Sequence, residues 1–220
     1  MSTVQTLSEQ IYTRVRDRII SGKLPTDKAI GQDALASELG VSKIPLREAF
    51  ARLEQDGLLL YMTNRGFFVR PLSSEGFEEV YALRLKIEPE AVALASTLAT
   101  DKDRHIALLH LNLLNKAYVP GRPVNGQLNR NFHMALVQPI RRPMTIQIIE
   151  RLNIASERYV TGHLQPVECG GRAHDEHTAL YDLWAAGKDD EVAALMHQHI
   201  NATLQDMRRQ LHAHKAEAMA

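Results

Sequence analysis

Three histidines and one asparagine in the second half of the chain have the spacing of residues that could bind a metal ion. Asn129 and His133 are four residues apart in L-N-R-N-F-H-M, so both lie on one face of a predicted helix. His177 and His199 lie on two later segments with helical periodicity. Imidazole nitrogens are common ligands of divalent zinc and nickel. The chain has ten histidines, however, and a histidine on a helix is more often a surface or core residue, so spacing alone leaves both interpretations open.

A second set of residues, near the N-terminus, is suited to reading DNA. A helix is expected to begin after Ser42, with Leu46, Phe50 and Leu53 on the face toward the core. Its opposite face carries Lys43, Ile44, Arg47 and Arg52. A helix with small and basic side chains near its N-terminus has the shape that enters a major groove. Taken singly, such residues are more often part of a solvated surface, so their meaning depends on the neighbouring elements.

The segment before this helix has the pattern of a first helix and a tight turn. Residues 33–39 show helical periodicity, and Gly40 follows where a helix end favours a residue that tolerates positive φ. Ser42 is expected to cap the next helix, and Pro45 lies in its first turn, where a missing N–H costs nothing. The sequence therefore predicts a helix-turn-helix.

A small hairpin is expected directly after the second helix. Two apolar runs, residues 58–62 and 67–69, flank the turn T-N-R-G at 63–66, whose Asn and Gly are typical of a hairpin tip. Arg65 at this tip is placed to reach a minor groove or a phosphate. Helix, turn, helix and hairpin in this order predict a winged helix-turn-helix.

This region resembles the DNA-binding domain of GntR-family bacterial transcription regulators. The resemblance lies in the run L-A-S-E-L-G-V-S-K-I-P-L-R-E-A-F-A-R-L-E-Q-D-G-L-L and in the predicted helix 8–20 with S-G-K-L after it. It implies a homodimer that reads a short palindromic operator in double-stranded DNA. The family commonly has Arg at the position of Lys43, and Lys cannot make the bidentate contact of Arg to guanine, so we expect looser base discrimination there. The residues that the resemblance places at the DNA are Ser42, Lys43, Arg47 and Gly66.

Beyond Pro71 the sequence shows helical patterns and no strand signals. Pro89 is expected to open a new helix at a bend, because proline inside a helix disrupts its hydrogen bonds. The predicted fold class is mainly α, with a winged helix-turn-helix domain at 1–72 and an antiparallel all-α helical bundle at 73–220. The expected helical segments are 74–98, 101–117, 125–137, 142–161, 172–186 and 189–216.

The bundle resembles the FCD ligand-binding domain of the FadR subfamily of GntR regulators, especially its VanR-like branch. Many such domains hold a divalent metal through an Asp and a His four apart and two later His. Asn in place of Asp removes one negative charge and weakens this ligand set. Three imidazoles still suit zinc or nickel and leave positions for water and an effector carboxylate. The matching residues are Asn129, His133, His177 and His199.

Two arginines of the bundle are candidates for binding the effector. Arg84 aligns with an arginine that often faces the cavity in this family, and a buried guanidinium needs an anionic partner, such as a small organic acid. An internal ion pair with Glu88, four residues on, explains Arg84 equally well. Arg130 is a weaker candidate for the same role.

Composition excludes some classes and is neutral about others. The formal net charge is zero, and ten Lys and Arg against eight Asp and Glu through residue 72 give only a faint basic excess, so DNA affinity must come from placed contacts. The single Cys169 excludes an internal disulfide framework. No apolar run has membrane-spanning length, and the N-terminus lacks a signal-peptide pattern, so we expect a cytoplasmic protein with no membrane partner.

The sequence therefore predicts an effector-responsive DNA-binding regulator, a repressor rather than an activator, which a small organic acid releases from its operator. One alternative is a metal-dependent, hydrolase-like enzyme that uses the three-histidine site. That reading lacks a convincing base, because Glu176 is adjacent to His177 and is expected to point away from the site. Another alternative is a regulator whose bundle has lost its metal.

Overall fold

The computed structural model describes residues 6–120, 125–163 and 169–218, without the side chains at 162–163, 169–170 and 211–218. The side chain of Cys169 thus lies outside the described residues. The chain divides into two compact units, residues 1–72 and 73–220. No helix in the described ranges is both long and apolar enough to cross a membrane.

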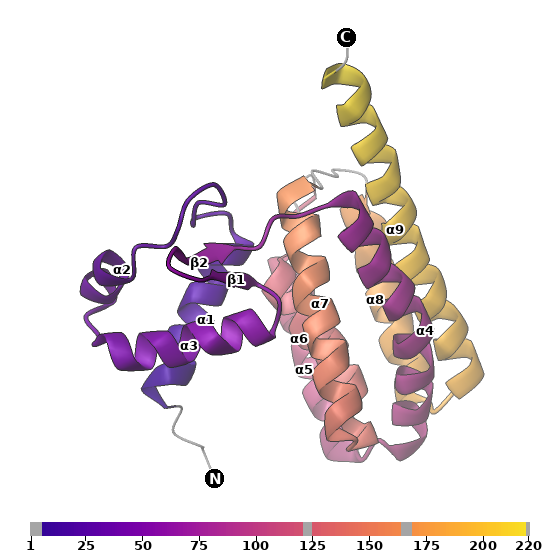
Figure 1. Ribbon diagram of the computed structural model, residues 1–220. Coiled ribbons are helices and arrows are strands. Elements are labelled where there is room, and N and C mark those ends of the chain that lie inside the picture. The colour runs from indigo at the N-terminus through magenta and orange to yellow at the C-terminus, as the bar shows by residue number, and fades with distance from the viewer. Residues whose placement is uncertain (1–5, 121–124, 164–168, 219–220) are drawn as a thin grey trace. The chain divides into compact units, whose positions relative to one another are not determined.

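The described residues of the first unit, 6–72, form three helices and a two-stranded antiparallel sheet (Figure 1). Helix α1 begins at a capping box, in which the side chains of Thr6 and Glu9 each accept a hydrogen bond from the other residue's backbone N–H. It packs against α3 around the fully buried Val15, Leu46 and Phe50, and the Phe50 ring meets Phe67 of the hairpin edge-on at 5.1 Å. The elements are α1 (Leu7–Ile20), α2 (Gln32–Leu39), α3 (Lys43–Gln55), β1 (Leu59–Met62) and β2 (Gly66–Val69).

The turn between α2 and α3 has the predicted backbone. Gly40 ends α2 with φ of 66°, a conformation that costs glycine little because it has no Cβ. Ser42 occupies the N-cap position of α3, but its side chain accepts no hydrogen bond from the helix. The predicted N-cap position is therefore right, but the predicted capping hydrogen bond is wrong. Ser42 is exposed at the start of α3.

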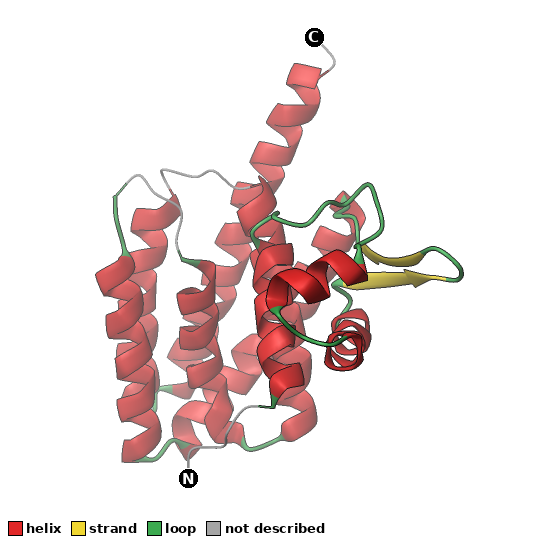
Figure 2. Cartoon of the chain, turned by 90° about the vertical axis from the view of Figure 1, so that its left-hand side faces the viewer, coloured by secondary structure: helices red, strands yellow, loops and turns green. Residues whose placement is uncertain are grey.

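The hairpin is one residue tighter than the sequence suggested. Strand β1 pairs with β2 in the register Leu59 with Val69 through Met62 with Gly66, so Gly66 begins β2 instead of closing the turn. Three residues form the connection, and Asn64 takes the left-handed conformation with φ of 61°. The wing is thus a short two-stranded ribbon (Figure 2). Arg65 is the last residue of the connection at its tip.

The second unit consists of helices that run side by side along the bundle (Figures 1 and 2). Helix α4 packs against α9 and α7, α6 packs against α5 and α7, and α8 packs against α9. The mainly α fold class, with a winged helix followed by an all-helical bundle, is confirmed. The elements are α4 (Ser74–Leu98), α5 (Asp101–Ala117), α6 (Gly126–Val137), the short 3-10 helix η1 (Gln138–Ile140), α7 (Pro143–His163), α8 (Cys169–Ala185) and α9 (Asp189–Ala218).

Helix α4 corrects one expectation. It continues without interruption through Pro89, so the prediction that Pro89 opens a new helix is wrong. A proline inside a helix removes one hydrogen bond and crowds the preceding turn. Pro89 is buried, however, and α4 is packed by α6, α7, α8 and α9. Tertiary packing can therefore outweigh the local cost of the proline.

Candidate DNA interface and metal centre

The predicted reading face of α3 is exposed. Ile44 is 72% exposed, and Lys43 and Arg47 are exposed beside it, while the residues of the opposite face are buried. The Lys43 ammonium lies 2.5 Å from the Asp33 carboxylate in a solvent-exposed ion pair. Such a pair contributes little stability, roughly 0 to 1 kcal/mol, so a phosphate or base can replace Asp33 at low cost.

Arg52 and Arg65 differ from the other basic candidates because their guanidinium groups lie over aromatic rings. Arg52 lies 4.4 Å from the centre of the Tyr12 ring, and Arg65 lies 5.4 Å from that of Phe68. The contact of Arg52 ties the last turn of α3 to α1, away from the N-terminus of α3. The contact of Arg65 instead orients a side chain at the tip of the wing. We therefore expect more DNA contact from Arg65 than from Arg52.

Three histidines from three helices meet in the core of the second unit. His133 comes from α6, His177 from α8 and His199 from α9, and all three are buried. One ring nitrogen from each lies within 4.8 Å of those of the other two. Their ring centres are 4.9 to 5.4 Å apart. The fold thus brings His133, His177 and His199 together, which their spacing in the sequence alone did not establish.

The chemistry of this cluster fits a divalent metal. Both ring nitrogens of His133 and Nε2 of His177 are buried without a hydrogen-bond partner. Buried polar atoms of this kind are costly unless something pairs with them. Burial, followed by the charges of the neighbouring histidines, holds the pKa of His133 and of His177 well below the usual value, so both rings are neutral. Neutral imidazoles with available lone pairs are the form that binds zinc or nickel.

Asn129 lies one turn before His133 on α6 and is half-buried. An amide oxygen can coordinate a cation but brings no charge to it. The role of Asn129 as a fourth ligand stays a prediction.

The structure reveals a residue at the cluster that sequence reasoning missed. Glu176 was expected to point away from the site, but its carboxylate lies 2.6 Å from Nδ1 of His199. Burial would raise the pKa of Glu176, but the hydrogen bond and charge of His199 and the charge of Arg172 outweigh it and lower the pKa. Because Glu176 immediately precedes His177, the two side chains leave α8 on different faces. Glu176 contacts His199 of α9. No sequence signal identifies a contact that depends on how α8 and α9 pack.

Arg84, one of the two effector candidates, is buried and already paired. Its guanidinium donates to both carboxylate oxygens of Glu88 at 2.6 and 3.1 Å, and to Ser156 at 2.7 Å and Asn153 at 3.3 Å. Burial would lower the pKa of Arg84, but the charge of Glu88 and its hydrogen bonds raise it, so the group stays a cation. The charge of Arg84 also helps to lower the pKa of His133, which places this network near the histidine cluster.

Arg130 is also buried, and it forms an ion pair with Glu157 of α7. The two arginines proposed for an anionic effector are therefore both neutralised by internal carboxylates. An effector acid would have to displace Glu88 or Glu157, or bind to another positive centre.

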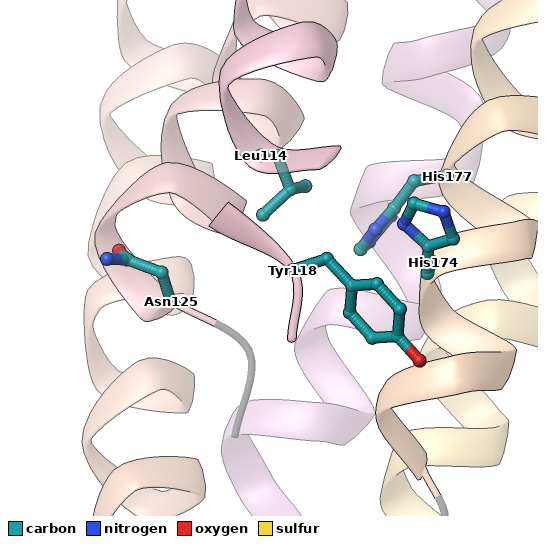
Figure 3. A pocket seen from close by; sticks show the side chains of 5 residues that line it. All are labelled: Leu114, Tyr118, Asn125, His174 and His177. Carbon is teal, nitrogen blue, oxygen red and sulfur yellow. The ribbon is translucent and has the colours of Figure 1, made fainter. Parts of the chain in front are cut away.

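A small pocket adjoins the histidine cluster (Figure 3). Its wall includes His177, which belongs to both the pocket and the cluster. The Tyr118 ring stacks on His174, with ring centres 4.4 Å apart and planes 13° from parallel. The lining residues are Leu114, Tyr118, Asn125, His174 and His177. The pocket therefore places open space directly beside His177, one of the predicted metal ligands.

Comparison with known protein families identifies both units. Residues 7–69 match the model described as bacterial regulatory proteins, gntR family, and residues 79–202 match the FCD domain. The chain is 33% identical over 174 residues to the Nta operon transcriptional regulator of Aminobacter aminovorans, covering 78% of this chain and 80% of that protein. It is 24% identical to the HTH-type transcriptional repressor RspR of Escherichia coli, covering 95% of this chain and 92% of RspR.

Solved structures share the fold. Escherichia coli McbR/YncC superposes with a TM-score of 0.77 at 20% identity, covering 94% of this chain and all of that one. A putative GntR regulator from Rhodococcus sp. RHA1 superposes with a TM-score of 0.72 at 22% identity, covering 89% and 94% of the two chains.

Proposed function

The chain belongs to the GntR family of bacterial transcription regulators and carries an FCD domain, and from this premise we propose that it is a cytoplasmic, homodimeric repressor released from a palindromic operator by a small organic acid. It is a DNA-binding transcription regulator and not an enzyme.

The observation that carries the proposal is the exposed reading face of α3 next to a wing. Arg47 is exposed on a helix whose other face is locked into the core by Leu46 and Phe50. A rigid helix with an exposed Arg can place a bidentate donor against the edge of a base pair. Ser42 and Lys43 at the N-terminus of the helix, and Gly66 and Arg65 on the wing, are assigned to phosphates and neighbouring bases. Ile44 is assigned to apolar contact in the groove.

We assign a homodimer because a single short reading helix contacts only a few base pairs. Two copies related by a two-fold axis read a palindrome, and the spacing of the half-sites follows from the distance between the two reading helices. The faint basic excess of the first unit also favours two copies, since a weak general field gives little affinity to one.

The effector is assigned to the region of the histidine cluster. A metal held there by His133, His177 and His199, with Asn129 as a weaker fourth ligand, would supply a cation with open positions for a carboxylate. This is a better anchor for an acid than Arg84 or Arg130, whose charges are already met by Glu88 and Glu157. The pocket beside His177 is the proposed route of entry.

Repression is the favoured direction of control. RspR and GlaR of Escherichia coli, both 24% identical to this chain, are named as transcriptional repressors. An effector shifts a regulator between states only by as much as its affinity for the two states differs. We therefore expect a modest induction factor.

The Arg47→Ala variant tests the DNA interface. Loss of the Arg47 guanidinium should lower affinity for the operator by at least tenfold, because a good bidentate contact is worth about 1 to 3 kcal/mol per half-site. The variant should also lose its preference for the operator over random DNA. Electrophoretic mobility shift and sedimentation would measure binding and assembly. The matched control is Arg142→Ala, which removes an exposed charge from the other unit. Tight, selective binding by Arg47→Ala would show that α3 is not the reading helix.

A further inference from the structure

Glu176 joins two helices at the histidine cluster. It lies on α8 next to His177, and its carboxylate contacts Nδ1 of His199 on α9 at 2.6 Å. The side chains of Glu176 and His199 are 13% and 7% exposed, so water competes little for this contact. The distance is that of a charge-assisted hydrogen bond.

The chemistry of the two groups decides which one donates. An ionised carboxylate has no proton and can only accept, so Nδ1 of His199 must carry the hydrogen. In the neutral ring, Nε2 then keeps its lone pair. With Nδ1 occupied by Glu176, Nε2 is the nitrogen that His199 can offer to a metal among the clustered ligand atoms.

The carboxylate is itself held in place from its other side. Arg172, one turn earlier on α8, donates to Glu176 at 3.0 Å and to Asp206 of α9 at 2.6 Å. Glu176 and Asp206 are thus bridged by one guanidinium, and the contact with His199 is fixed from both helices. Arg209 adds a second ion pair to Asp206.

We propose that Glu176 is a positioning residue, which holds His199 in the tautomer with a free Nε2 and so prepares the three-histidine cluster for a divalent metal. The inference rests on the proposed metal-dependent function. Partners of this kind orient a metal ligand and fix its tautomer without touching the ion, and their loss typically weakens metal binding by about 10- to 100-fold.

The Glu176→Gln variant gives a sharp test because it keeps the shape of the side chain. Arg172 has only donors, so it takes the amide oxygen, and the amide N–H₂ then faces His199. His199 must accept at Nδ1 and carry its proton on Nε2. Zinc affinity, measured by competition with a chromophoric chelator, should fall about 10- to 100-fold. The matched control is Asp175→Asn, which removes the same charge from the exposed neighbouring residue and should leave zinc affinity unchanged.

A second readout requires no metal. Nitrogen-15 NMR of the histidine rings at pH 8 should show the His199 proton on Nδ1 in the wild-type protein and on Nε2 in Glu176→Gln. The same spectra of Glu176→Ala, which has neither donor nor acceptor at this position, should show no fixed Nδ1 tautomer.

The outcomes separate this inference from the function on which it rests. Wild-type zinc binding that Glu176→Gln leaves unchanged, or a wild-type His199 with its proton on Nε2 or on both nitrogens, would overturn the role of Glu176. A wild-type protein that binds no zinc would overturn the metal part of the proposed function. In that case, the nitrogen-15 spectra would still show whether Glu176 determines which ring nitrogen of His199 carries the proton.

Discussion

At the scale of single residues, Lys43 is the side chain on the reading face whose chemistry differs most from the family pattern. Its ammonium is a point charge that can contact a phosphate or one acceptor atom, whereas an arginine there would pair with two acceptors of a guanine. In the free protein it pairs with the exposed carboxylate of Asp33. DNA must therefore replace a weak surface ion pair before Lys43 contributes.

The Lys43→Arg variant should sharpen base discrimination. A gained bidentate contact is worth about 1 kcal/mol or more, so the preference for the best operator over one changed at the contacted base should rise severalfold. Binding to a set of operators with single substitutions, at fixed salt, measures this. An unchanged preference at every base would mean that Lys43 contacts the phosphate backbone only.

The histidines of the cluster give a second residue-scale prediction. His177→Ala removes a buried ligand, so zinc affinity should fall by about a hundredfold or more, beyond the range typical of outer partners. His197→Ala, an exposed histidine on α9, is the matched control and should bind zinc as the wild type does. Chelator competition on both variants gives the numbers. Equal zinc affinity for His177→Ala and the wild type would remove His177 from the ligand set.

At the scale of the elements, the tight turn between α2 and α3 sets the angle at which the reading helix is presented. Gly40 has φ of 66°, and a Cβ built there meets no atom within 4 Å. A substitution at Gly40 is therefore destabilising because of the left-handed backbone conformation and not because of steric crowding.

Gly40→Ala should lower the free energy of unfolding of the first unit by about 1 kcal/mol, the usual penalty of an L-residue in the left-handed region. Gly40→Asn should cost less, because asparagine tolerates this region better. Chemical denaturation followed by circular dichroism tests the order. An alanine variant as stable as the wild type would show that the turn relaxes to another conformation.

Local patterns predicted most of the elements, and packing between elements explains what they missed. Periodicity, Gly40 and the T-N-R-G turn were sufficient to place the helices and the hairpin of the first unit. The prediction at Pro89 failed because it applied a local rule to a helix that continues through the proline and is packed by α6, α7, α8 and α9. Similarly, Glu176 reaches His199 only because α8 and α9 lie together, and no spacing in the sequence encodes that contact.

The candidate site shows the same difference between what local patterns predict and what packing between helices determines. His133, His177 and His199 could be named from spacing together with a family resemblance, but their convergence within 4.8 Å is a property of three packed helices. The partners of Arg84 show the converse case. The internal pair with Glu88 was one of two open readings, and the structure adds Ser156 and Asn153, which lie about seventy residues further along the chain.

At the scale of the whole molecule, a short connection joins the two units. Strand β2 ends at Val69 and α4 begins at Ser74, so few residues separate the wing from the bundle. The start of α4 is tied to α7, because Ser73 donates its backbone N–H to the hydroxyl of Tyr159 at 3.5 Å. A change in the bundle that moves α4 can therefore reach the wing along the chain.

Metal binding should stabilise the second unit if the histidine cluster is its site. A ligand that binds only the folded state adds about 2.7 kcal/mol when its free concentration is a hundred times its dissociation constant. Calorimetry with buffered zinc and with a chelator should thus give a higher melting temperature with zinc, and His177→Ala should lose most of the difference. A melting temperature independent of zinc would favour a bundle that works without metal.

The most direct measurement of the central claim is to recover the DNA that the purified protein retains from sheared genomic DNA of its source at moderate salt, with and without candidate organic acids. We predict enrichment of one short palindrome, lost in the Arg47→Ala variant and reduced by an acid that binds the bundle. No enriched sequence under any condition would contradict the claim that this chain is an effector-controlled, sequence-specific regulator.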